Sequence, residues 1–315
     1  MYKRVCVVLV TYNRSNCLAT AIKAIEAQSV KPAGVLVFDN NSSDDTIEYL
    51  KQQGYSEIKR GEEEQIDRSY YHSSENLGGS GGFSLAVELA SQADFDYLWI
   101  MDDDVAPTKN CLEILLNQMQ QNKVQVTIPA RKGPNFTDKV CIDLDTTNFL
   151  KFFIWWRKKY AKRPLNRDTY TVKDMTFEGP LISNELVKRV GKPDGGYFIQ
   201  FDDTDYAQRL LRFSKIIYVR NAVLLRQLPA KIINHNEKKT PMNWKDYYFI
   251  RNNVVFDKRY GKKWMVRKIS PLLMVLYYVA LSVKDGNVRT NFPIIIKAAR
   301  DGMAGKMGKQ VDPNY

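Results

Sequence analysis

Histidine and cysteine, two residue types from which metal and redox sites are often built, are scarce in this sequence. Only two histidines and four cysteines occur among its 315 residues. The cysteines form neither a CxxC pair nor the spacing of a zinc site, and Cys6 lies in a strand-like apolar run. We therefore expect reduced structural thiols in a cytosolic protein rather than a disulfide framework.

We expect neither an export signal nor a membrane-spanning segment. The N-terminus enters a strand-like run within a few residues, without the basic segment, apolar stretch and cleavage site of a signal peptide. The most apolar stretch, ISPLLMVLYYVALSV (269–283), is shorter than the roughly 20 residues of a spanning helix. Because basic residues flank it, this stretch predicts a helix in the plane of a membrane or a partner interface, with a buried helical hairpin as the alternative.

The positive charge of the chain is unevenly distributed. The formal net charge is +12, yet residues 1–150 are net acidic and residues 251–315 are strongly basic. Either a nucleic acid or an anionic membrane surface would suit the basic end. Because the first half is acidic and also carries the loops in which an α/β protein binds its ligands, we expect the basic end to contact a membrane surface, and we expect no nucleic acid as partner.

Strand-like and helical patterns alternate through the first 130 residues. The strand-like runs are VCVVLV (5–10), VLVFD (35–39), part of 66–72, YLWIM (97–101) and VQVTIPA (124–130). Alternation of this kind predicts an α/β fold with a mostly parallel sheet flanked by helices. Ligands of such sheets bind beyond the carboxyl ends of the strands. The segments at those ends are TYNR (11–14), DNNSSD (39–44), NLGGSGG (76–82) and DDD (102–104).

Two of these segments have a specific chemical meaning. Three adjacent acids directly after a strand are favourable if a divalent cation occupies the space between them, and hard oxygen ligands suit Mg²⁺ or Mn²⁺. The alternative is a solvated acidic loop that caps the helix expected over 108–121. A glycine-rich turn before a helix suits a phosphate, although NLGGSGG lacks the GKS or GKT of a P-loop, and a flexible turn is its alternative.

Taken together, the segments resemble the family 2 inverting glycosyltransferases of the GT-A fold. The matching pieces are VVLVTYNR, VFDNNSSDDT, ENLGGSGGF and WIMDDDV, followed by FEGPLIS, VGKPDGG, FDDTDYAQR and, more loosely, YYFIRNN. ENLGGSGGF followed by MDDDV is most similar to the galactofuranosyltransferase and rhamnosyltransferase subset. The resemblance covers roughly residues 4–260, and four ordered motifs are far more specific than one.

The resemblance implies a role for each matching residue. For the nucleotide sugar, it places Thr11 and Asn13 at the nucleotide, Asp39 at the base, Asn76, Gly78 and Gly79 at the ribose or diphosphate, and Asp102 or Asp103 at the ribose. For the metal, it implies Asp102 and Asp104 as ligands of Mn²⁺ or Mg²⁺, with His235 as the third ligand. It implies Asp203 as the general base. Ordinary turn or helix-capping roles are the alternatives for Thr11, Asn13, Asp39 and Asp203. For His235 a surface position is an equal alternative. The segment near where the family's histidine is expected is LLRQLP (224–229), which contains no histidine.

The domain organisation expected from these motifs has two parts. Residues 1–260 form the catalytic domain, with a nucleotide-sugar-binding half (1–130) and an acceptor and catalytic half (131–260), and residues 261–315 form a basic, apolar helical segment for membrane or interface contact. Within 149–164, FLKFFIWWRKKYAKRP fits an acceptor-site lid, a membrane-contacting patch or a buried aromatic helix.

The predicted activity is an inverting, metal-assisted transfer of a sugar from a nucleotide sugar to a hydroxyl of a lipid-linked or cell-surface polysaccharide. The resemblance implies UDP-galactofuranose as donor, with dTDP-rhamnose as the alternative. It also implies cell-envelope polysaccharide biosynthesis. The basic, apolar C-terminus predicts a cytoplasmic enzyme that is peripheral on the inner face of the cell membrane, and a homo-oligomer is compatible with the sequence. A sugar nucleotidyltransferase is disfavoured because the N-terminus lacks a glycine-rich strand-to-helix loop with a basic partner.

Overall fold

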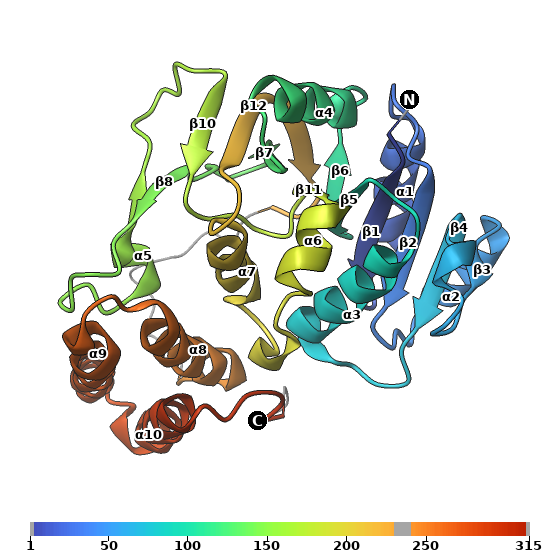
Figure 1. Ribbon diagram of the computed structural model, residues 1–315. Coiled ribbons are helices and arrows are strands. Elements are labelled where there is room, and N and C mark those ends of the chain that lie inside the picture. The colour runs from blue at the N-terminus through green and yellow to red at the C-terminus, as the bar shows by residue number, and fades with distance from the viewer. Residues whose placement is uncertain (1–2, 230–240, 313–315) are drawn as a thin grey trace.

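The protein is built around one large sheet with helices on both faces, followed by a layer of three helices (Figure 1). The computed structural model describes residues 3–229 and 241–312. In the first half the strands are β1 (Val5–Thr11), β2 (Gly34–Asp39), β3 (Ser56–Glu57), β4 (Arg68–His72), β5 (Tyr97–Asp102) and β6 (Val105–Pro107), and the helices are α1 (Ser15–Glu26), α2 (Thr46–Gln52), α3 (Gly78–Gln92) and α4 (Cys111–Gln121).

The second half adds shorter strands and the C-terminal helices. Its strands are β7 (Val126–Lys132), β8 (Cys141–Leu144), β9 (Lys158–Tyr160), β10 (Thr169–Val172), β11 (Leu181–Ser183) and β12 (Ile216–Arg226). Its helices are α5 (Ile154–Arg157), α6 (Asn184–Val190), α7 (Asp202–Leu210), α8 (Trp244–Tyr260), α9 (Trp264–Lys284) and α10 (Val288–Ala304).

The strand order of the sheet is β10-β12-β7-β11-β5-β1-β2-β4-β3, with β6 paired to β12. Strands β5, β1, β2 and β4 run parallel, so their carboxyl ends meet at one edge. Strand β11 is antiparallel between β5 and β7, whereas β12 returns parallel to β7. The predicted α/β fold with a large sheet flanked by helices is confirmed. Its antiparallel strands are β6, β10 and β11.

Alternating side chains of β1 divide the interior into two cores. Val8 and Val10 pack beneath α3 in one core, whereas Val7 and Leu9 pack beneath α1 and α4 in the other. All seven residues of β1 are buried, because helices cover both faces of the sheet. This double burial explains why the strand reads as a continuous apolar run rather than an alternating one.

Helices α8, α9 and α10 pack together around a third core, seen as the orange and red helices of Figure 1. Tyr248 and Val254 of α8 contact this core together with Met274 of α9 and Ile295 of α10. The boundary expected after residue 260 falls between α8 and α9, and the segment 261–315 contributes to the same core as α8.

Helix α9 is longer than the apolar run from which it was expected. Its 21 residues include WMVRK before the run, and by length and composition alone this helix could cross a membrane. Leu272 and Leu276 on one side of α9 are exposed, whereas Met274 and Ser270 are buried. The helix therefore has a buried face against α8 and α10 and an exposed apolar face.

The aromatic and basic segment around Trp155 is tied to the C-terminal helices. The guanidinium of Arg157 is buried and donates to Asp257 of α8 at 2.9 Å and to Ser270 of α9 at 3.2 Å. Trp155 and Trp156 beside it are more than 40% exposed. The segment thus combines a buried anchor with exposed indole rings, which joins two of the alternatives that the sequence left open.

Candidate active site

Four segments that are distant in the sequence line one cavity of about 210 Å³, called here the carboxylate cavity. They are the start of α3, the end of β5, residues 176–178 and the turn that leads into α7. The cavity-lining residues are Gly79, Ser80, Phe83, Asp102, Thr176, Phe177, Glu178, Ile199, Gln200, Asp202 and Asp203. The structure therefore brings together three residues that the sequence singled out separately: Gly79, Asp102 and Asp203.

The carboxyl pair Asp202 and Asp203 stands at the first turn of α7, after an unusual backbone segment. Phe198, Gln200 and Phe201 all have positive φ values, at 66°, 64° and 70°. Such conformations cost on the order of 1 kcal/mol or more each for side chains other than glycine, so the surroundings must hold them. The buried ring of Phe201 packs against two aromatic rings of α8, which fixes the entry into the helix.

A buried amide of α8 supports the same turn. The side-chain nitrogen of Asn252 donates to the backbone oxygens of Tyr197, Ile199 and Gln200 at 3.1, 2.7 and 3.1 Å. Arg251 donates to the oxygen of Tyr197 at 2.7 Å. YYFIRNN matched the family only loosely, and the signal that could have revealed this role is the polar run RNN between the apolar stretches YYFI and VVF of α8.

The two acids of the pair differ in their electrostatic surroundings. Burial, followed by the neighbouring Asp203 charge, raises the pKa of Asp202. Burial and the charge of Asp174 raise the pKa of Asp203 as well, but Lys158 and the backbone N–H of Thr204 oppose that rise. The Thr204 N–H donates to Asp203 at 2.6 Å. Asp203 is therefore the member of the pair that ionises more readily.

Asp103 is held inside the protein rather than at the cavity. Strand β5 ends at Asp102, and the carboxylate of the next residue accepts from Thr11 Oγ1 at 2.8 Å and from Arg14 Nη1 at 3.1 Å. Only 1% of Asp103 is exposed. Thr11 and Asp103 thus pair with each other across β1 and β5, while Asp102 faces the cavity.

The chain around residue 227 supports the acidic turn from the other side. The backbone N–H of Gln227 donates to the oxygen of Asp104 at 2.8 Å, and its side-chain amide donates to the oxygen of Asp103 at 3.0 Å. Gln227 belongs to the LLRQLP segment, near where the sequence resemblance placed a histidine. His235 itself lies outside the described residues.

The acidic turn has features that fit a divalent cation. Asp104 Oδ1 is buried and has no hydrogen-bond partner among residues 3–229 and 241–312, while its Oδ2 lies 3.5 Å from Arg14. Burial, with the charges of Asp103 and Asp104, raises the pKa of Asp102 well above its usual range. Among the described residues no three acidic, histidine or cysteine side chains converge on one point. The donor set therefore suits Mg²⁺ or Mn²⁺ held by one or two carboxylates plus substrate phosphates.

The glycine-rich turn is shaped by contact with the turn before α7. Gly78 has φ +72°, and a Cβ there would overlap the backbone oxygen of Phe198. A Cβ at Gly79 would meet nothing within 4 Å, which leaves that position open to the cavity. Asn76 accepts from the Gly78 N–H at 2.8 Å and from the Asn40 amide at 3.1 Å. Asn40 was not among the predicted site residues, although it lies in the DNNSSD motif.

The loop after β2 is held by hydrogen bonds to the buried carboxylate of Asp39. Asp39 accepts from the Ser42 N–H at 3.2 Å, and its Oδ2 lies 2.6 Å from His72 Nδ1. Asn13, with φ +51°, accepts from the Ser43 N–H at 2.7 Å. Asp39 and Asn13 thus fix the conformation of residues 39–44. His72 was not among the predicted site residues, and its ring lies beside Asp39 at this predicted nucleotide end.

Comparison with known proteins gives a consistent relationship. The sequence profile described as Glycosyl transferase family 2 matches residues 6–191, which is more than half of the chain. Galactofuranosyltransferase GlfT1 of Mycolicibacterium smegmatis is 28% identical over 220 residues, covering 66% of this chain and 65% of that protein. GlfT1 of Mycobacterium tuberculosis is 27% identical over 218 residues, covering 67% and 66%. The chain thus spans just under two thirds of the length of these relatives.

Solved structures share the fold at low sequence identity. The structure of GalNAc-T7 with UDP, GalNAc and Mn²⁺ superposes with a TM-score of 0.58 at 12% identity, over 82% of this chain and 49% of that one. Staphylococcus aureus TarS 1–349 in complex with UDP-GlcNAc gives 0.56 at 13% identity, over 95% and 81%. This likeness confirms the GT-A type fold that the sequence resemblance implied.

Proposed function

The chain belongs to glycosyl transferase family 2, and on that basis we propose that it is an inverting glycosyltransferase whose donor is UDP-galactofuranose. The observation that carries this proposal is the carboxylate cavity, where Gly79, Asp102 and Asp203 from three distant segments meet. The two GlfT1 proteins, named galactofuranosyltransferases, support the choice of sugar. dTDP-rhamnose is the competing donor within the family.

The nucleotide would lie beyond the carboxyl ends of β1, β2 and β4. Residues Thr11, Asn13, Asp39, Asn76, Gly78 and Gly79 would frame it. Gly79 is open to the cavity, and the N-terminus of α3 begins at the preceding residue, so backbone N–H groups and the helix dipole would favour an anionic diphosphate there. Asp102 would reach the ribose or the metal from the end of β5.

Asp102 and Asp104 would hold Mn²⁺ or Mg²⁺ together with phosphate oxygens of the donor. The ion would neutralise the negative charge of the departing nucleotide diphosphate. The buried Oδ1 of Asp104, which has no hydrogen-bond partner in the described part of the chain, supports this assignment, as does the Mn²⁺ named with the GalNAc-T7 structure. His235 remains the proposed third ligand and lies outside the described residues.

Asp203 would act as the general base. An inverting transfer is a single displacement, so the acceptor hydroxyl must lose its proton while the diphosphate leaves from the opposite face. Asp203 lines the cavity and ionises more readily than Asp202 because Lys158 lies close by. Its carboxylate would accept the hydroxyl proton, while the buried Asp202 retains its own.

We also propose that a membrane-facing surface serves a lipid-linked acceptor at the inner face of the cell membrane. The exposed apolar side chains of this surface are Trp155, Trp156, Trp264, Leu272 and Leu276, and exposed basic residues near them in the chain are Lys262, Lys263 and Lys268. Indole rings and leucines suit the bilayer boundary, and the basic side chains complement anionic headgroups. On this view 261–315 is the attachment segment of a catalytic domain formed by 1–260.

The test is the mass of the product made from a panel of nucleotide sugars. The protein, Mn²⁺ and an organic-solvent extract of source-cell membranes are incubated with UDP-galactofuranose, UDP-galactopyranose or dTDP-rhamnose. A hexose added only from UDP-galactofuranose is the expected result. A deoxyhexose from dTDP-rhamnose, or a hexose from UDP-galactopyranose without a mutase, would replace the proposed donor.

A further inference from the structure

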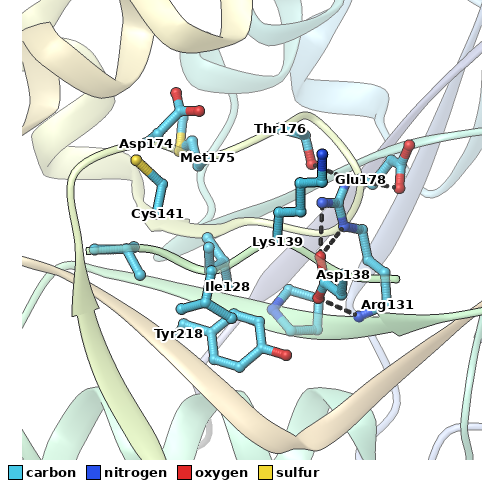
Figure 2. Close-up of a pocket in the computed structure, with 13 residues that line it drawn as sticks. Ile128, Arg131, Asp138, Lys139, Cys141, Asp174, Met175, Thr176, Glu178 and Tyr218 are labelled. Carbon is cyan, nitrogen blue, oxygen red and sulfur yellow. Dashed lines mark hydrogen bonds and ion pairs between the residues drawn. The ribbon is translucent and has the colours of Figure 1, made fainter. Parts of the chain in front are cut away.

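A second cavity adjoins the carboxylate cavity, and a third adjoins the second. The first, of about 40 Å³, shares Thr176 and Glu178 with it and is called here the bridging cavity (Figure 2). The second, of about 660 Å³, shares Arg131, Asp138 and Tyr218 with the bridging cavity and is called the cationic cavity. The shared walls place the three in a row, with the bridging cavity in the middle.

The sign of the charge changes along this row. The carboxylate cavity is lined by four acids and no basic side chain: Asp102, Glu178, Asp202 and Asp203. The cationic cavity is lined by four basic side chains and one acid: Arg131, Lys132, Arg163, Arg220 and Asp138. One end therefore suits a cation and a developing nucleophile, whereas the other suits an anion.

The partition between the two ends is a satisfied ionic cluster. Arg131 donates to Asp138 at 2.7 Å and to Glu178 at 3.1 Å, and Figure 2 shows its guanidinium directed toward both carboxylates. Arg226 donates to Glu178 from the other side at 2.9 Å. Because Arg131 is fully engaged, the groups that remain to receive an external anion are the outer ones of the cationic cavity.

The outer basic groups, Lys132 and Arg220, remain accessible to an anion from solvent. Lys132 is exposed and is in no ion pair within the described part of the chain. Arg220 donates through Nη1 to the backbone oxygen of Leu165 at 3.1 Å and through Nη2 to Asp168 at 2.8 Å. The Asp168 side chain is 70% exposed, and a pair that exposed contributes little, so an anion can replace Asp168 at Nη2. Both basic groups are therefore available to a phosphate or carboxylate that enters from solvent.

From this arrangement we propose that the cationic cavity binds an anionic group of the acceptor, a phosphate or a carboxylate. The hydroxyl that receives the sugar then lies at Asp203, and the bridging cavity separates it from the anionic group. This inference rests on the proposed function and specifies its acceptor class. Phosphodiesters and uronates share the chemistry that Lys132 and Arg220 would recognise.

The test compares two ligands that differ only in a phosphodiester: octyl galactoside and octyl galactosyl phosphate. Their affinities are measured by titration calorimetry in the presence of UDP and Mn²⁺, for the wild type and for Lys132→Gln/Arg220→Gln. The control, Lys123→Gln/Lys215→Gln, removes two exposed charges that precede β7 and β12 and lie outside the three cavities. An octyl galactosyl glucuronide serves as the carboxylate arm.

We expect the wild type and the control to bind octyl galactosyl phosphate about tenfold more tightly than octyl galactoside, and the double variant to lose that preference. Equal affinities in the wild type, or a preference that survives in the double variant, overturn the proposal. Inorganic phosphate that binds as tightly as the phosphodiester shows a free-phosphate site and also overturns it. The affinity for UDP is measured with the same protein samples. A wild type that does not bind UDP would show that the proposed function fails, rather than the proposed acceptor site.

Discussion

His72 lies over Asp39 at the carboxyl ends of two adjacent parallel strands. Its Nδ1 is 2.6 Å from Asp39 Oδ2, and the two residues are partners in the register of β4 and β2. The Asp39 side chain is fully buried, whereas that of His72 is 37% exposed. This contact holds the imidazole ring of His72 at the carboxyl-terminal edge of the sheet.

We expect His72→Ala to weaken UDP binding about tenfold, because the buried Asp39 carboxylate loses a hydrogen-bond partner at the proposed base-binding end of β2 and β4. His72→Gln, which retains a donor toward Asp39, should lose less. Calorimetry with UDP and Mn²⁺ measures both. An unchanged UDP affinity in His72→Ala would show that this end of β2 and β4 does not contact the base.

Asp203→Asn should retain UDP affinity but reduce single-turnover sugar transfer by roughly 10²- to 10⁴-fold, since a general base is lost while size is kept. The same change at Asp202 should cost less, because that residue holds its proton more strongly. Near wild-type transfer by Asp203→Asn, with an inactive Asp202→Asn, would reverse the two roles.

Asp205→Asn is a matched control with a different expected readout. Asp205 accepts from Tyr260 at 2.7 Å and pairs with Arg259 at 3.1 Å, and it does not line the carboxylate cavity. Its replacement weakens the hydrogen bond from Tyr260 to a buried carboxylate and the ion pair with Arg259, so thermal stability should fall, while transfer per folded molecule is largely kept. Circular dichroism melting beside the transfer assay separates these effects.

The rate of transfer should rise with pH. Burial and Asp174 raise the pKa of Asp203, so the base is protonated at acidic pH and becomes available as pH increases through that raised value. The rate then levels off once the carboxylate is ionised. Single-turnover rates at saturating donor, measured from about pH 5 to 9, test this; a rate that falls over the lower half of that range contradicts the assignment.

Asp102→Asn and Asp104→Asn should each abolish the part of UDP affinity that depends on Mn²⁺, because each removes an anionic ligand of the proposed ion. Titrations of UDP with Mn²⁺ and with EDTA measure that part directly. Asp103→Asn would not test the metal site, because the Asp103 carboxylate accepts hydrogen bonds from Thr11 and Arg14. Metal dependence that persists in both variants would remove the metal assignment.

Leu272→Ser/Leu276→Ser should reduce binding to phosphatidylglycerol vesicles while UDP affinity is kept, because both side chains are more than half exposed on α9. Phe213→Ser, at another exposed apolar site, is the control. Vesicle flotation measures the bound fraction, and equal binding by the wild type and the α9 variant would exclude this face from membrane contact. Deletion of 261–315 is less informative, because α9 and α10 complete the core that contains Tyr248.

Local sequence patterns were enough to predict the parallel strands of the first 130 residues and the edge at which the site lies. Continuous apolar runs indicate strands buried on both faces, and polar segments directly after them must meet where parallel carboxyl ends converge. Asp102 and Gly79 were found in this way. The family resemblance added Asp203, whose carboxylate lies in the same cavity.

What only the tertiary structure decided depends on contacts between residues distant in sequence. The register of β2 and β4 places His72 over Asp39, contact with Phe198 requires a glycine at 78, and Asn252 of α8 holds the turn before Asp202. Strand and helix periodicity report which face a residue occupies but not which distant residue it meets. The sequence therefore determined the elements and their polar ends, while long-range packing determined which carboxylate is open to the cavity and which is bonded inside.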